Sequence, residues 1–351
     1  MFLVEKAFFG LVSYFATVVI VPALGRYTLE AGLCGKDLNK LGQPLIPEAG
    51  GVAAGAVFLI VVILSQAYQW VGFANETATT FVIEYYAALA SICFMTLLGF
   101  ADDVLDLPWR YKLVFPALAT LPLLMAYDGP TGLVVPIPLR PLLGVFIELS
   151  FLYKIYMLLV AIFCTNAINI HAGINGLEAG QALIIACSIA LHNLLELDGE
   201  FTRNHVFSLC LIVPFIGVTL GLLRHNSYPA TIFVGDTFTF LAGMTLATVA
   251  ILSHVSKTLM LFFLPQILNF LISFPQIVFW ECPRHRLPKF NPETKCLEAV
   301  PTHWNLLNQV LRVVGPCREK RLTQILLGLQ VAASIFAFLV RYWIAAYFYS
   351  P

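Results

Sequence analysis

Charged residues are scarce in this chain of 351 amino acids: they make up 11% of the sequence, against 59% hydrophobic residues. Acids and bases balance to a formal net charge of zero, which leaves no overall field to attract nucleic acid. A soluble domain cannot bury so large an apolar fraction, so the composition indicates a polytopic membrane protein. The alternative is a large soluble α/β enzyme, whose buried strands have apolar runs of about 4–8 residues, whereas the runs here approach about 20.

Several familiar motifs are also missing. No two cysteines have the CxxC spacing and half of the 8 cysteines lie in apolar runs, so we expect free thiols rather than a disulfide framework. The Walker loop, GxGxxG and HExxH are absent, which removes the common signatures of nucleotide and zinc sites. The first apolar run has no basic segment before it and no small-residue cleavage site, so we expect it to stay as the first span.

About ten apolar runs have the length of about 17–25 residues that a membrane-spanning helix needs. The fourth is short and contains two prolines, which membrane helices tolerate when neighbours satisfy the freed carbonyls. We predict an all-α polytopic membrane protein, a single domain over residues 1–351, with a short cytosolic loop at residues 281–320 between the last two spans. The expected spans are Ala7–Leu24, Gly51–Phe73, Thr80–Phe100, Lys112–Tyr127, Val145–Thr165, Glu178–Leu195, Val206–Leu223, Thr237–Ser253, Thr258–Trp280 and Arg321–Phe348.

Positive charge is shared unevenly between the two sides of this predicted bundle. Most of the 20 Lys and Arg residues fall in the loops after the first, third, fifth, seventh and ninth spans. Basic loops stay in the cytosol, so we expect these loops to be cytosolic and both termini to lie on the opposite side. The sequon that begins at Asn75 falls on that opposite side, which agrees with this orientation.

The side chains that could perform chemistry gather in the same loops. Asp102 and Asp103 lie where the third span ends, and Asn166, Asn169 and Asp236 lie in or beside two later loops of that side. Each has a simpler explanation by itself: Asp236 could cap a helix, and the two asparagines, three residues apart, could bond to a neighbouring helix. These residues gather on one side of the membrane, while the loops of the far side have almost no such polar residues. This uneven distribution favours a functional site.

Oxygen ligands and cations are both present on that side, which is the combination that a magnesium–diphosphate site requires. Mg²⁺ binds one or two carboxylates and otherwise keeps water and phosphate oxygens. Suitable oxygen ligands are Asp102, Asp103, Asn169 and Asp236. Cations that could neutralise a diphosphate are Lys112, Arg284 and Arg286. The inventory predicts metal-assisted phosphoryl transfer between a soluble diphosphate and a membrane-held acceptor, with the active-site cleft on the cytosolic face.

The loops that carry these residues resemble those of the polyprenyl-phosphate N-acetylhexosamine-1-phosphate transferases, and the resemblance extends over essentially the full length of the chain. It is strongest to the eukaryotic members, which use dolichyl phosphate. The matching segments are Leu33–Lys40, Gly99–Leu105, Asn166–Gly180, Val234–Thr237 and Pro283–Arg286. The resemblance implies transfer of N-acetylglucosamine-1-phosphate from UDP-N-acetylglucosamine to dolichyl phosphate, the first step of N-glycan precursor assembly. It also implies Mg²⁺, inhibition by tunicamycin, a homodimer, and a site on the cytosolic face of the endoplasmic reticulum membrane.

The resemblance assigns roles to individual residues. The implied metal ligands are Asn169 and Asp236. The implied diphosphate ligands are Lys112, Arg284 and Arg286. The implied uridine pocket consists of Leu38, Glu48, Gly173, Asn175 and Phe233, with Phe233 stacking on uracil. Trp109 and His285 would lie near the sugar, and Asp102 and Asp103 at the acceptor end.

The expected reaction is a direct attack by the lipid phosphate. A phosphomonoester has its second pKa near about 6, so the acceptor is already largely ionised at neutral pH, and positioning matters more than a strong base. We therefore expect Asp102 or Asp103 to orient the acceptor, to remove its last proton, or to hold Lys112.

Three features depart from the animal relatives: His171 stands where an apolar residue is expected, Asp106 replaces an asparagine, and the loop at residues 281–320 is shorter. The shorter loop puts a folded subdomain there in doubt. A bacterial-type transferase using undecaprenyl phosphate and a secondary transporter are the alternatives. Transporters carry charges near the bilayer midplane and internal repeats, neither of which is evident here.

Overall fold

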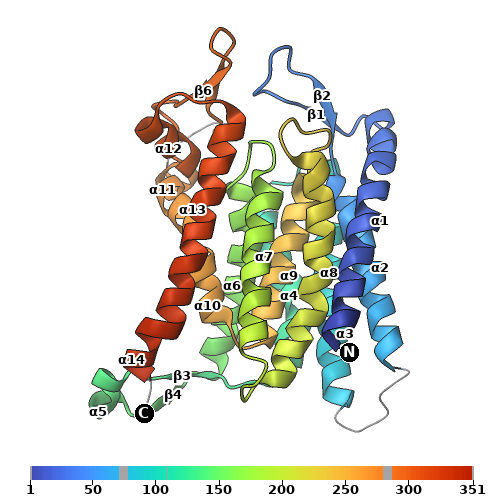
Figure 1. Cartoon of the computed structure of the whole chain (residues 1–351). Coiled ribbons are helices and arrows are strands. Elements are labelled where there is room, and N and C mark those ends of the chain that lie inside the picture. Colours follow the sequence, from blue (N-terminus) through green and yellow to red (C-terminus); the bar gives the residue numbers. More distant parts are fainter. Residues whose placement is uncertain (1, 71–77, 109, 280–286, 350–351) are drawn as a thin grey trace.

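The computed structural model describes residues 2–70, 78–108, 110–279 and 287–349, in which long helices run side by side as one bundle (Figure 1). The helices are α1 (Phe2–Glu30), α2 (Gly50–Trp70), α3 (Ala78–Leu105), α4 (Tyr111–Ala126), α5 (Arg140–Leu143), α6 (Phe151–Ile170), α7 (Leu177–Leu195), α8 (Thr202–Asn226), α9 (Gly235–Leu252), α10 (Ser256–Phe262), α11 (Leu264–Val278), α12 (Leu306–Val314), α13 (Glu319–Leu339) and α14 (Ala345–Tyr349). A 3₁₀ turn (Ile137–Leu139) precedes α5, and a π-helical turn (Val340–Ile344) joins α13 to α14.

The all-α polytopic class is confirmed, since each expected span contains a helix. In the described part of the chain, eight helices are long and apolar enough to cross a membrane. The pair α10 and α11, bent by 69°, makes a ninth candidate, and α4 is an apolar helix of 16 residues that is shorter than a usual span. Pro265 lies in the first turn of α11, where its ring and missing N–H prevent α10 from continuing straight.

The fifth expected span, Val145–Thr165, was placed wrongly at both ends. Its first residues form strand β4 (Phe146–Glu148), which pairs antiparallel with β3 (Gly132–Val134), and the helix α6 begins only at Phe151. Hydropathy could not distinguish the strand from the helix because both are apolar. The shift carries α6 as far as Ile170, so Asn166 and Asn169 lie in its last turns instead of in a loop.

Helix α9 occupies the centre of the bundle, and most of its residues are buried. It packs against α2, α3, α6 and α8. The contact with α3 depends on a glycine: a Cβ built on Gly99 would lie 2.6 Å from the Cα of Thr237. Small residues allow two helix backbones to approach this closely in membrane proteins. The first turn of α9 is therefore held against the last turns of α3.

The two ends of the bundle differ (Figure 1). The β3–β4 hairpin, α5, the start of α1 and α14 lie at one end, and the hairpins β1–β2 and β5–β6 lie with α12 at the other. Strand β1 (Cys34–Lys36) pairs with β2 (Leu45–Pro47), and β5 (Lys289–Asn291) with β6 (Cys296–Glu298). We call the end that carries β1–β2 the loop end.

The described part of the expected short loop, from residue 287 onward, is folded rather than open. Strands β5 and β6 and helix α12 share a second buried apolar cluster with the first turns of α7 and α13. Its central side chains include Leu297, Leu307 and Leu311, and Ile174 from the loop before α7 belongs to the same cluster. A short segment thus retains a folded unit, because it completes its core with residues of the membrane helices.

Candidate active site

The carboxylate of Asp103, at the end of α3, holds the first turn of α9. Its Oδ1 accepts the backbone N–H of Asp236 at 2.5 Å, and its Oδ2 accepts the backbone N–H and the hydroxyl of Thr237 at 3.1 and 2.5 Å. These amides are among the helix N–H groups that lack a partner within the helix. Gly235 makes room, since its Cβ would lie 2.5 Å from Asp103 Oδ2 and its φ is +73°. Asp103 therefore fixes Asp236 in place.

Lys112, from the first turn of α4, lies between two carboxylates. Its Nζ is 2.5 Å from Asp102 Oδ2 and 2.7 Å from Asp236 Oδ2. Asp102 is 3% exposed and also accepts the backbone N–H of Leu107 at 2.9 Å. The buried Asp102 thus orients the lysine, whose ammonium is partly accessible and faces the Asp236 side.

The two asparagines at the end of α6 contact this group in different ways. Asn169 donates from Nδ2 to Asp236 Oδ1 at 2.8 Å. Asn166 donates to the carbonyl of Lys112 at 3.0 Å and to that of Ile162 at 2.8 Å. Asn166 therefore supports the backbone of the lysine, while Asn169 and Asp236 stand side by side with their polar atoms toward the same space.

A cavity of about 730 Å³ lies at the loop end and joins most of the predicted site. Lys112, Asn169 and Asp236 line it, and so do the five residues expected for a uridine pocket: Leu38, Glu48, Gly173, Asn175 and Phe233. Asp102 and Asp103 are not among its lining residues; they act on it through Lys112 and Asp236. Trp109, Arg284, His285 and Arg286 lie outside the described residues, so their roles remain predictions.

Near the residues of the expected uridine pocket, burial and charge raise the pKa of Glu48. The main cause is burial of the carboxyl, and the negative charge of Asp236 adds to it. The Phe233 segment is fixed nearby, because its carbonyl accepts the N–H of Gly50 at 2.9 Å and its own N–H donates to the carbonyl of Pro47 at 2.9 Å. Phe233 is thereby held over the N-terminus of α2.

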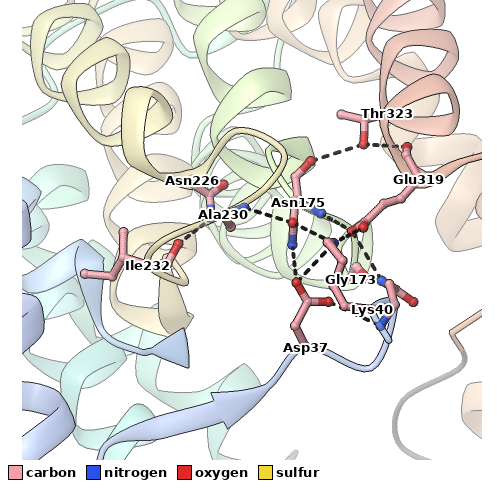
Figure 2. A network of polar contacts seen from close by, with 10 residues as sticks. Asp37, Lys40, Gly173, Asn175, Asn226, Ala230, Ile232, Glu319 and Thr323 are labelled. Atoms are coloured by element: carbon pink, nitrogen blue, oxygen red, sulfur yellow. Dashed lines mark hydrogen bonds and ion pairs between the residues drawn. The ribbon is translucent and has the colours of Figure 1, made fainter. Parts of the chain in front are cut away.

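Asn175 lines the cavity, but the protein itself uses both ends of its amide (Figure 2). Its Oδ1 accepts the N–H of Ala230 and the ammonium of Lys40, both at 3.0 Å, and its Nδ2 faces Asp37 Oδ2 at 3.4 Å. The surrounding polar residues were not predicted as site residues. Asp37 and Lys40 are three residues apart, but Glu319 comes from a distant part of the chain, so no local sequence signal joins it to them.

The arrangement fits a magnesium ion at Asn169 and Asp236. A carboxylate and an amide together face a polar cavity that has room for a phosphorylated ligand, and Mg²⁺ takes few protein ligands and relies on phosphate and water oxygens. The described residues contain no group of three or more His, Cys, Asp or Glu side chains placed to hold a metal.

A helical membrane bundle with this site at one end defines a polytopic membrane transferase. Residues 85–254 match the profile of glycosyl transferase family 4. The chain is 49% identical to the UDP-N-acetylglucosamine–dolichyl-phosphate N-acetylglucosaminephosphotransferase of Dictyostelium discoideum, over 97% of this chain and 89% of that one. Enzymes of the same name from Schizosaccharomyces pombe and Saccharomyces cerevisiae are 38% and 37% identical, over 97% and 98% of this chain and 92% of each. The chain belongs to glycosyl transferase family 4, among the dolichyl-phosphate N-acetylglucosaminephosphotransferases.

Proposed function

We propose that this chain transfers N-acetylglucosamine-1-phosphate from UDP-N-acetylglucosamine to dolichyl phosphate and releases UMP. The observation that carries the proposal is one cavity lined both by Lys112, Asn169 and Asp236 and by the residues of the expected nucleotide pocket. The relatives named for this reaction match nearly the whole chain, which supports the same substrates here.

In the proposed reaction, an oxygen of the lipid phosphate forms a bond to the β-phosphorus of the donor. The bond from that phosphorus to the bridging oxygen breaks, and UMP leaves with the electron pair. Lys112 lies where it can offset negative charge on the diphosphate, and Asp102 holds the ammonium in that position. The acceptor is largely ionised at neutral pH, so we assign Asp102 the role of orienting Lys112 rather than that of an essential base.

Asn169 and Asp236 are the residues that would hold Mg²⁺. When bound, the ion would supply positive charge to the diphosphate oxygens. Asp103 contributes by fixing the backbone of Asp236. The carboxylate of Asp236 therefore keeps its position when the charge on the neighbouring diphosphate changes.

For the cellular setting, we propose the endoplasmic reticulum membrane, with the loop end in the cytosol. The excess of Lys and Arg in the loops of this end supports the orientation. The acceptor phosphate could then reach Lys112 from the membrane surface. The homodimer stays a prediction from the resemblance, and the mass of the purified protein in detergent tests it.

The deciding experiment measures UMP release by the purified chain with UDP-N-acetylglucosamine, dolichyl phosphate and Mg²⁺, with and without tunicamycin. We expect release that needs all three components and that tunicamycin blocks. Undecaprenyl phosphate in place of dolichyl phosphate tests the bacterial-type alternative. No UMP release from folded protein with either lipid would refute the proposal.

A further inference from the structure

The first residue of the last long helix holds the loop at residues 173–175, which lines the cavity (Figure 2). Glu319 begins α13 and is 4% exposed. Its Oε1 accepts the backbone N–H of Asn175 at 2.8 Å, and its Oε2 pairs with the ammonium of Lys40. An acid from the C-terminal helix thus holds a loop that lines the cavity.

Lys40 is the shared cation of this group. Its Nζ contacts Glu319, lies 3.1 Å from Asp37 Oδ2, and donates to Asn175 Oδ1 at 3.0 Å. Asp37 and Glu319 both have side chains that are 3% exposed, so their charges are poorly solvated. Two buried carboxylates that face each other repel unless a cation lies between them, and Lys40 is that cation.

Neighbours of Lys40 and Glu319 also fix the backbone of the loop before α7 at two positions, Gly173 and Asn175. Asn39 donates from Nδ2 to the carbonyl of Gly173 at 3.1 Å, and Thr323, one turn into α13, donates to the carbonyl of Asn175 at 3.1 Å. Gly173 and Asn175 line the cavity, whereas Lys40 and Glu319 do not. Lys40 and Glu319 therefore reach the cavity through the loop.

We propose that Lys40 and Glu319 are positioning residues that set the loop at residues 173–175 for the nucleotide part of the donor. The inference rests on the proposed function, and it adds two residues to which no role in the reaction has been assigned. We expect Lys40 and Glu319 to affect binding of the nucleotide donor and not that of the lipid acceptor. The reason is that the Lys112 cluster is built from α3, α4, α6 and α9 and shares no side chain with the group around Lys40.

The test compares Lys40→Met, Glu319→Gln and the double variant Lys40→Met/Glu319→Gln. In Lys40→Met, Asp37 and Glu319 face each other without a cation, so we expect KM for UDP-N-acetylglucosamine to rise about tenfold or more while kcat changes by less than about twofold. KM for dolichyl phosphate should stay at the wild-type value. The double variant removes one of the repelling charges and keeps an acceptor for Asn175, so its KM should be lower than that of Lys40→Met.

Glu196→Gln is the matched control. Glu196 is also near the end of a long helix and pairs with Arg341 at 3.8 Å, but it follows α7, at the end of that helix away from the cavity. It should leave both KM values unchanged. UDP binding, measured by calorimetry, gives a readout without turnover and should weaken in Lys40→Met as KM rises.

Two outcomes overturn the inference: an equal change in kcat and both KM values, or a double variant that is worse than Lys40→Met. Wild-type turnover is the separate test of the proposed function. If the wild type binds UDP but releases no UMP, the proposed function fails, while the UDP affinities of the variants still decide the inference.

Discussion

The adjacent acids Asp102 and Asp103 have different partners, although they are neighbours in the sequence. Asp102 faces Lys112, while Asp103 caps α9 and fixes Asp236. Three roles were considered for the pair: to orient the acceptor, to remove its last proton, or to hold Lys112. The contact with Lys112 belongs to Asp102, and neither carboxylate lines the cavity. An effect of Asp103 on catalysis must therefore pass through the position of α9.

Asp103→Asn tests this role. An amide offers one acceptor oxygen and turns an N–H toward donors, so the first turn of α9 loses part of its anchor. We expect kcat to fall about 100-fold, because a displacement of about 1 Å at a site can have that effect. The loss should not shrink as the pH is raised above neutrality, where the wild-type carboxylate is ionised. Steady-state rates across pH check this, and recovery of activity at high pH would show instead that Asp103 moves a proton.

His171 makes the stability of the fold depend on pH. It follows α6, is 2% exposed, and its burial lowers its pKa from 6.5 to about 4, so it is neutral at physiological pH. Between these two values the unfolded chain binds more protons than the folded one. The free energy of unfolding therefore falls as the pH drops, by at most about 1.4 kcal/mol per pH unit.

His171→Leu replaces this group with an apolar side chain of similar size. We expect the variant to lose less stability than the wild type as the pH falls from 6.5, the ordinary pKa of histidine, to about 4, its pKa in the folded protein. Thermal unfolding in detergent at several pH values measures the difference. Parallel pH dependences of the two proteins would contradict the assignment.

At the scale of elements, hydropathy predicted where helices lie but not how they meet. All ten runs contain helix, because a long apolar run in a membrane has to satisfy its backbone hydrogen bonds internally. The error at Val145 arose because an apolar strand and an apolar helix look alike in sequence. The residue types of the site were predictable, whereas the contact of Asp103 with α9 depends on tertiary packing, and so does that of Glu319 with Lys40.

The packing of α3 on α9 gives a prediction at this scale. In Gly99→Ala the new methyl group would lie 2.6 Å from the Cα of Thr237 and 2.8 Å from the carbonyl oxygen of Asp236. Overpacking of this kind costs about 1–3 kcal/mol, and here it also separates Asp103 from the amides it holds. We expect a lower unfolding temperature together with a large loss of kcat.

Gly328→Ala provides the control, since this glycine lies within α13 and, apart from its chain neighbours and the backbone of its own helix, no described atom lies within 4 Å of its built Cβ. Alanine favours a helix over glycine by about 1 kcal/mol, so the control should be neutral or slightly stabilising. Thermal unfolding and turnover of both variants provide the comparison. Equal effects of the two substitutions would mean that the close approach at Gly99 is unimportant.

For the whole molecule, the proposed orientation rests on the charge of the loops at the end that carries the cavity. The folded unit of β5, β6 and α12 lies at the loop end (Figure 1). Residues of the β1–β2 hairpin and of the loop before α7 line the cavity, which places it at the same end. The positive-inside rule predicts that this end faces the cytosol. The connection from α7 to α8 lies at the other end and carries the acids Glu196, Asp198 and Glu200. A nucleotide sugar is water-soluble, so the proposed reaction requires the cavity to open to the compartment that supplies this donor.

Cysteine labelling in sealed vesicles with the cytosolic face outward tests the orientation. Glu293→Cys adds a thiol at the exposed turn between β5 and β6, and Glu200→Cys adds one at the exposed connection between α7 and α8. A membrane-impermeant maleimide should label Glu293→Cys above the wild-type background without detergent, and Glu200→Cys only after permeabilisation. The reverse pattern would place the cavity in the lumen, where a donor made in the cytosol could not reach Lys112 and Asp236 without a separate carrier.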